Sequence, residues 1–310
     1  MVSPALLNLI ATAALAAALP QPRAAVAQDA EPADVISTRT DIQLRMTVPV
    51  HIGEAGPFRF MIDTGAQNTV LGETLADRLK LPEGKSVTLS GLAGTRAVRT
   101  VTIDELVLGK RSYYSLTAPL LEEHNIGADG IVGVDSLQGQ RVLIDFRADT
   151  MTIDDKRNFG KEDGYDIVVV ARRKSGQLIM TDARIDGVNV NVVIDTGAEG
   201  SIGNLALLQA MGKRGAALTQ TILTSVTGQE TPAQIAYARR LTIHGMEIQN
   251  VAVAFADAPP FRSLGLDKRP ALFLGMRELR VFRRIAIDFP SRRVFFQIPS
   301  DLRQADPFGF

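Results

Sequence analysis

The sequence predicts a mostly β protein built from two similar lobes, and three observations carry that prediction. The tetrapeptide Asp-Thr-Gly-Ala occurs twice, beginning at Asp63 and again at Asp195, which lies 132 residues further along the chain. Helical patterns are few and short, so strands should dominate both lobes. Apolar residues also recur at every second position of one early segment, as in a half-buried strand: they are Ile42, Leu44, Met46, Val48 and Val50.

Length and composition limit the kinds of function. The 310 residues suffice for roughly two domains. Lys plus Arg and Asp plus Glu number 34 each, and this balance argues against nucleic acid or an anionic membrane as the main partner. The absence of Cys excludes disulfides, thiolate metal sites and a Cys nucleophile. His51, His124 and His244 are scattered without an HExxH motif, so we expect neither a metal nor a cofactor.

The first residues have the pattern of an export signal. An apolar run from Ala5 to Leu19 precedes an Ala25-Val26-Ala27 cleavage motif, which predicts a signal peptide over residues 1–27. The run is short for a membrane span, so the mature chain should have none and should be periplasmic or secreted. An uncleaved anchor is the alternative, because no Lys or Arg precedes the run. Residues 28–40 would then be an N-terminal lead, either a pro-segment or a disordered segment.

The first repeat, residues 41–154, is expected to form one lobe. A strand that begins at Phe60 ends at Asp63, where Gly65 permits a tight turn. A helical pattern follows, with Leu71, Leu75 and Leu79 on one face. The segments that come next are a Gly-containing stretch between strands (Ser90–Ala97), an apolar-apolar-Gly sequence ending at Gly133, and a core strand, "VLIDF" (Val142–Phe146).

The second repeat, residues 166–300, is expected to have the same order of elements. After the turn at Asp195, Leu205, Leu208 and Met211 are spaced for a helix that Gly212 would end. "SVTGQE" (Ser225–Glu230), Gly275 and "IAIDF" (Ile285–Phe289) match the later segments. Asp145 and Asp288 in the two core strands are expected to serve turns. Residues 155–165 form a charged linker, and residues 301–310 a C-terminal tail.

Two such turns on related lobes can bring Asp63 and Asp195 together across a pseudo-two-fold axis. Two carboxyl groups about 3 Å apart cannot both ionise, so the pair would hold one proton. The ionised member can take a proton from a water molecule, while the protonated member polarises a substrate carbonyl. The alternative is that each aspartate only caps the helix that follows it.

With these motifs the chain resembles the retropepsin-like aspartic proteases, here as two tandem units, from about Ile42 to Gln297. The resemblance implies a bilobal acid-protease fold made of two retropepsin-like β-barrel lobes with short helices. It also implies that Asp63 and Asp195 are the catalytic pair. Supporting loop residues would be Thr64, Gly65, Ala66, Thr196, Gly197 and Ala198, with the two Thr hydroxyls interlocked beneath the pair.

Further roles follow from the same resemblance. Gln67 and Glu199 occupy the position that often contacts substrate backbone, and Gly133 and Gly275 would allow the loops under each aspartate to pack. Ser90–Ala97 and Ser225–Glu230 are the candidate flaps, in which Gly91, Gly94 and Gly228 would lie near substrate. An ordinary hairpin turn is the alternative for each flap.

Two departures from pepsin-type relatives stand out. Neither flap candidate contains a Tyr. Ala66 and Ala198 stand where pepsins usually have Ser or Thr, whose hydroxyl would favour the ionised carboxylate. The missing hydroxyls lead us to expect activity that extends toward neutral pH.

The sequence therefore predicts an aspartic endopeptidase that acts on peptide or protein substrates in the periplasm. A non-catalytic peptide-binding relative that retains the cleft is the alternative function. We expect a monomer, and a dimer with swapped lobes is the alternative assembly.

Overall fold

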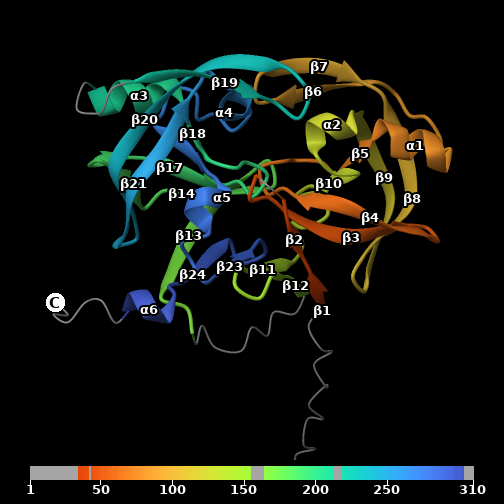
Figure 1. Cartoon of the computed structure of the whole chain (residues 1–310), viewed down its shortest axis with the longest axis horizontal. Coiled ribbons are helices and arrows are strands. Elements are labelled where there is room, and N and C mark those ends of the chain that lie inside the picture. The colour runs from red at the N-terminus through yellow and green to blue at the C-terminus, as the bar shows by residue number, and fades with distance from the viewer. Residues whose placement is uncertain (1–33, 42, 155–163, 213–217, 304–310) are drawn as a thin grey trace, which may run out of the picture. The chain divides into compact units, whose positions relative to one another are not determined.

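Each Asp-Thr-Gly-Ala turn lies in its own lobe, and a sheet that takes strands from both lobes joins them (Figure 1). The computed structural model describes residues 34–41, 43–154, 164–212 and 218–303. The predicted signal peptide, residues 28–33 of the lead and most of the linker lie outside these ranges. Strands predominate and the helices are short, which confirms the mostly β fold with two lobes.

The first lobe contains a closed barrel of six strands. Its hydrogen-bonded order is β3 (Met46–Ile52), β4 (Ala55–Ile62), β10 (Gly130–Val132), β5 (Val70–Gly72), β9 (Arg111–Leu121) and β8 (Thr100–Leu108). Pairing of β8 with β3 closes the barrel. Outside it lie β2 (Arg39–Thr40), the hairpin of β6 (Val87–Gly91) and β7 (Gly94–Val98), and the helices α1 (Glu73–Leu79) and α2 (Glu123–Ile126).

The second lobe repeats this arrangement with one interruption. Its order is β14 (Gln177–Met180), β17 (Asn191–Ile194), β22 (Ala271–Leu274), β18 (Ser201–Gly203), β21 (Met246–Phe255), β20 (Glu230–Ile243), β15 (Ala183–Ile185) and β16 (Val188–Asn189). The counterpart of β3 is divided into β14, which pairs with β17, and β15, which pairs with β20. β19 (Thr219–Thr224) pairs with β20, and the helices are α3 (Leu205–Met211), α4 (Pro259–Ser263), α5 (Met276–Leu279) and α6 (Ser300–Arg303).

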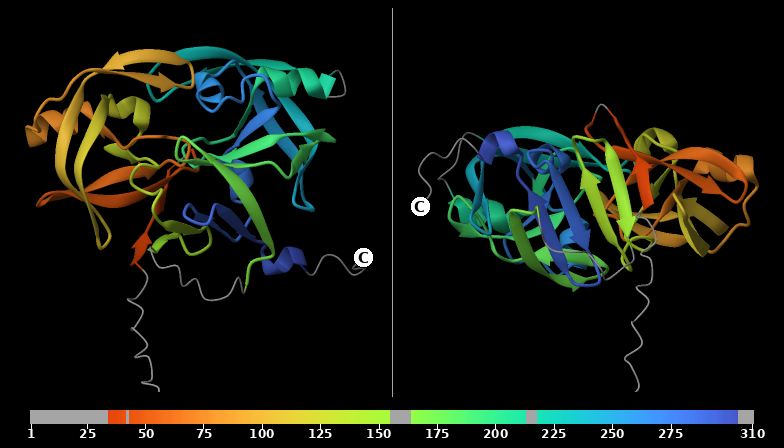
Figure 2. Two further views of the ribbon diagram at one scale, coloured as in Figure 1. Left: turned by 180° about the vertical axis from the view of Figure 1, so that it is seen from behind. Right: turned by 90° about the horizontal axis from the view of Figure 1, so that it is seen from below.

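One strand of the lead and five strands from the two repeats form the sheet that joins the lobes (Figure 2). They follow the order β1 (Asp34–Ser37), β12 (Thr150–Asp154), β11 (Arg141–Asp145), β23 (Arg284–Asp288), β24 (Arg293–Gln297) and β13 (Ile167–Lys174). The two predicted core strands, β11 and β23, are antiparallel partners at its centre, with Leu143 opposite Ala286. Asp145 and Asp288 accept backbone N–H groups of the turns that follow, as expected.

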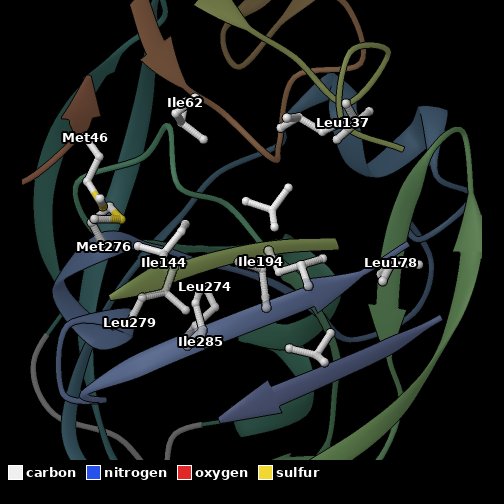
Figure 3. Packing of buried hydrophobic residues seen from close by; sticks show 14 of the residues in the cluster. Met46, Ile62, Leu137, Ile144, Leu178, Ile194, Leu274, Met276, Leu279 and Ile285 are labelled. Carbon is white, nitrogen blue, oxygen red and sulfur yellow. The ribbon is translucent and has the colours of Figure 1, made fainter. Parts of the chain in front are cut away.

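The hydrophobic core runs through both lobes and the joining sheet. Ile144 of β11 and Ile285 of β23 are completely buried in one cluster that also contains Met46 and Leu274 (Figure 3). Side chains from both repeats therefore exclude water together, and each lobe buries apolar surface that would be exposed in the other's absence.

Three details of the predicted elements are wrong. The early strand begins at Met46, because Leu44 has a left-handed φ of 63° in a turn. Leu71 belongs to β5, and α1 begins only at Glu73. In α3, Leu207 and Met211 are buried while Leu205 is half exposed, although Gly212 ends the helix as predicted.

Part of the predicted N-terminal lead forms strands. Asp34–Ser37 forms β1 and Arg39–Thr40 forms β2, so this stretch belongs to the folded protein. Ile42 lies outside the described residues. The Asp34 side chain is buried and accepts the backbone N–H of Lys110, which anchors β1 to the β8–β9 turn.

Candidate active site

Each predicted catalytic aspartate stands at the end of a buried strand. Asp63 follows β4 and Asp195 follows β17, and each strand has a parallel partner that ends beside it. The N–H of Asp63 donates to the carbonyl of Val132 at 3.1 Å, and that of Asp195 to Leu274 at 3.0 Å. These bonds fix both aspartates where the strands give way to turns.

The turn that follows each aspartate holds its carboxylate from one side. Asp63 Oδ1 accepts the N–H groups of Gly65 at 2.8 Å and Ala66 at 3.0 Å. The N–H groups of Gly197 and Ala198 bind Asp195 Oδ1 in the same way, at 3.0 and 3.2 Å. Amide donors favour the charged form of a carboxylate. The turns therefore orient both carboxyl groups and partly stabilise charge on them.

The two Thr side chains beneath the aspartates are buried and interlock. Thr64 Oγ1 donates to the Ile194 carbonyl, and Thr196 Oγ1 to the Ile62 carbonyl, each at 2.8 Å. Each hydroxyl oxygen also accepts the backbone N–H of the other Thr, at 3.1 and 3.3 Å. The turn of each lobe is thus hydrogen-bonded to the strand of the other.

The glycines of the turns allow the closest approach between the lobes. A Cβ atom on Gly65 would lie 2.7 Å from Asp195 Cγ, and one on Gly197 would lie 2.3 Å from Asp63 Cγ. Any side chain at these positions would collide with the opposite carboxylate. With glycine at both, Asp63 and Asp195 come within hydrogen-bonding contact of each other.

Both carboxyl groups hold their protons more strongly than free aspartates. Loss of hydration is the main cause that raises the pKa of Asp63 and, to a greater extent, that of Asp195. The negative charge of Asp63 is the second cause for Asp195. The pair is therefore suited to holding a single proton, with one member ionised and the other neutral.

The aspartates open into a cavity of about 1120 Å³ that both lobes line. Its apolar wall is formed by Val70, Leu89, Leu121 and Ile131 of the first lobe, and by Ile202, Leu223, Ile235 and Phe273 of the second. A cavity of this size with two carboxyl groups at its floor can hold several residues of an extended peptide.

The residues predicted to contact substrate do not all lie in this cavity. Gln67 and Glu199 both line it, and Glu199 pairs with Arg277 at 2.8 Å. Gly91 lines it as well. Gly94 and Gly228 are absent from its lining, and they lie against Gln229 and Asn125 where the two lobes touch.

The loops under the aspartates pack without side chains at two glycines. A Cβ on Gly133 would lie 2.4 Å from the Asn68 carbonyl carbon, and one on Gly275 equally close to that of Gly200. Both glycines also donate their N–H groups to hydroxyls of the turn loops, Thr69 and Ser201. The loop after each apolar-apolar-Gly sequence therefore supports the turn that carries the aspartate.

The two candidate flaps lie side by side (Figure 1), and residues of both line the cavity. Arg96 of the β6–β7 hairpin donates to the Thr227 carbonyl of the β19–β20 loop at 3.0 Å. Leu92 of the first flap packs on a hydrophobic cluster of the second lobe, and Val226 of the second on a cluster of the first. Each flap is therefore anchored on the opposite lobe.

Sequence reasoning missed two buried polar residues of the cavity wall, Arg45 and Gln177. The Gln177 amide donates to the Gly65 carbonyl in the turn of the other lobe. The repeat itself contained the signal for these residues. Each lies 18 residues before the aspartate of its own lobe, in corresponding places.

The described residues show no group of three or more His, Asp or Glu side chains that could hold a metal ion. Within the same part of the chain, none of the helices has both the length and the apolar character that crossing a membrane requires.

Comparison with known proteins assigns both repeats to one family. The sequence model described as Aspartyl protease matches residues 48–136 and again residues 181–277. Each match contains one Asp-Thr-Gly-Ala turn and the apolar-apolar-Gly sequence that supports it. A search of the curated proteins finds no match to this chain.

Proposed function

Because the chain belongs to the aspartyl protease family, we propose that it is an aspartic endopeptidase whose water nucleophile is activated between Asp63 and Asp195. The observation that carries the proposal is the contact of two dehydrated carboxyl groups at the ends of equivalent strands. A protein that only binds peptides has no use for two acids that oppose each other's ionisation.

The proposed reaction needs no group besides the two aspartates and water. The ionised carboxylate takes a proton from the water as its oxygen attacks the peptide carbonyl carbon. The protonated carboxyl transfers its proton to the carbonyl oxygen, which becomes a hydroxyl of the tetrahedral intermediate. The C–N bond then breaks as the leaving nitrogen receives the proton that the pair holds. One hydroxyl of the intermediate returns its proton to the pair as the new carboxyl C=O forms, so the pair again holds one proton.

The flaps support an extended peptide as the substrate. The β6–β7 hairpin and the β19–β20 loop meet over the aspartates, so a folded domain would not fit beneath them. We propose that they separate to admit a chain segment and then exclude water around it. The export pattern of residues 1–27 supports a periplasmic or secreted location, where the enzyme would process other exported proteins.

The test is cleavage of a mixed peptide pool by the mature protein, with new termini identified by mass spectrometry between pH 3 and 8. We expect cleavage that a statine-type inhibitor blocks and that Asp63→Asn and Asp195→Asn each reduce by at least ~10³-fold. Asp145→Asn is the matched control, because it makes the same change in a turn of the joining sheet.

Two results would contradict the proposal. Cleavage that persists in either dyad variant would show that the aspartates do not act as a pair. Absence of cleavage, together with retained peptide binding by fluorescence anisotropy, would favour the non-catalytic peptide-binding alternative.

A further inference from the structure

The two halves of the active site differ at one buried position of the cavity wall. Arg45 in the first lobe and Gln177 in the second occupy corresponding places in the repeat. Only 9% of Arg45 and 2% of Gln177 is exposed, and both line the cavity that contains the aspartates. One lobe therefore presents a permanent cation where the other presents a neutral amide.

The guanidinium of Arg45 is held firmly in this wall. Its Nε donates to Asp41 Oδ2 at 2.8 Å, and its backbone N–H donates to Asp41 Oδ1 at 2.9 Å. Gly127 provides the space beside it, since a Cβ there would lie 2.5 Å from Arg45 Nη2. The cation thus has a fixed position relative to the aspartates rather than a mobile one in solvent.

Other charged groups also line the cavity, but they are more accessible to water. Arg59 and His124 are exposed, and the half-exposed Arg277 is already paired with the half-exposed Glu199. Water and salt screen such groups strongly. Among the described lining residues, Arg45 is the buried cation, with Asp41 as its partner.

The hydrogen bonds to the two aspartates also favour negative charge on Asp63 over Asp195. The amide donors of the turn lie at 2.8 and 3.0 Å from Asp63 but at 3.0 and 3.2 Å from Asp195. Burial raises the pKa of Asp63, and the charge of Arg45 is among the effects that oppose this rise. Burial and the neighbouring Asp63 raise the pKa of Asp195 well above its ordinary value.

We propose that Arg45 makes the two aspartates unequal, so that Asp63 carries the negative charge of the resting pair and Asp195 carries the shared proton. If the proposed function holds, Asp63 is then the base that deprotonates water, and Asp195 is the acid that polarises the carbonyl. Arg45 is a positioning residue in this scheme: it sets the direction of proton transfer without touching the substrate.

The direct test follows the carboxyl carbons of ¹³C-labelled aspartates by NMR across pH in the free protein, with Asn variants to assign the signals. We expect Asp63 to titrate in the lower step. Arg45→Gln, which copies the residue of the second lobe, should move that lower midpoint upward by on the order of one pH unit. Asp41→Asn removes the anion beside the guanidinium and should move the lower midpoint downward.

Arg45→Lys and Arg59→Gln are the controls. The first keeps the buried charge and the second removes an exposed cation of the same cavity, so both should leave the lower midpoint within ~0.3 units. Thermal unfolding shows which variants fold. If Arg45→Gln does not fold, Asp41→Asn still tests the inference. An unchanged lower midpoint in a folded Arg45→Gln protein, or an equal shift in Arg59→Gln, would overturn the inference.

Activity provides a second, separable measurement. The acidic limb of kcat/KM should move to higher pH in Arg45→Gln by the same amount as the NMR midpoint. Normal cleavage with no such movement would reject the role of Arg45 and leave the protease assignment intact. An NMR shift in a protein that cleaves no peptide would support the charge placement and reject the proposed function.

Discussion

At the scale of single residues, the feature with the clearest chemical consequence is the alanine after each Asp-Thr-Gly. Ala66 packs against a hydrophobic cluster of the first lobe and Ala198 against one of the second. Each donates only its backbone N–H, Ala66 to Asp63 and Ala198 to Asp195. Neither side chain can donate a hydrogen bond, so at these positions only the backbone N–H opposes the dehydration that raises the pKa of both carboxyl groups.

We therefore predict that activity extends toward neutral pH and that Ala198→Thr reverses this. An added hydroxyl next to Asp195 stabilises its ionised form and lowers its pKa. Asp195 then loses its proton at a lower pH than in the wild-type protein. The alkaline limb of kcat/KM should move down by roughly 0.5 to 1 unit. Ala148→Ser, in a turn of the joining sheet, is the control. A wild-type profile confined to strong acid would contradict the prediction.

At the scale of elements, the two turns behave as one unit because of the buried threonines. Thr196 Oγ1 donates to Ile62 at the end of β4 and accepts the N–H of Thr64, so one side chain serves two groups of the other lobe. Buried backbone groups that lose such partners are expensive, because no water replaces them.

Thr196→Val keeps the shape of the side chain but removes both hydrogen bonds. We predict a loss of roughly 2–4 kcal/mol in the free energy of unfolding, from two unsatisfied buried groups. Activity should fall as well, since the carboxyl groups would no longer be held in register. Urea unfolding measures the first effect, with Thr242→Val on β20, partly exposed, as the control. A change below ~1 kcal/mol would show that the hydrogen bonds of Thr196 contribute little to stability.

At the scale of the whole molecule, both aspartates reach the same cavity from within one chain. The central pairing of β11 with β23 and the core cluster that spans both repeats hold the lobes together. A large shared core of this kind resists separation of its parts. We infer that the monomer is the active unit, in preference to a dimer with swapped lobes.

Mixing two inactive variants tests this inference. In a swapped dimer, each site takes Asp63 from one chain and Asp195 from the other, so unfolding and refolding Asp63→Asn together with Asp195→Asn would assemble some sites with both carboxyl groups. In a monomer no site can regain both. We predict no recovery of cleavage after co-refolding, with refolded wild-type protein as the control, and a monomer by light scattering. Recovery of about a quarter of wild-type activity would establish the swapped dimer.

The sequence by itself determined the repeat, the strand–turn pairs and the place of the two acids. These features depend on residues close together in the chain: a period-two run, a glycine that permits a turn, and a helix that ends at Gly212. The ends of the elements were predicted less accurately: Leu44 and Leu71 lie outside the elements to which their spacing assigned them. Local turn geometry overrode the apolar pattern at Leu44.

Only the tertiary structure decided how the repeats meet. Residues far apart in the chain meet where β11 pairs with β23 and where each flap is anchored on the opposite lobe. Folding also brings Arg45 of one lobe and Gln177 of the other into the wall of one cavity. No local pattern encodes such contacts, because they follow from the fit of two packed lobes rather than from the preferences of any one segment. The sequence provides two equivalent acids, and the folded environment makes them different.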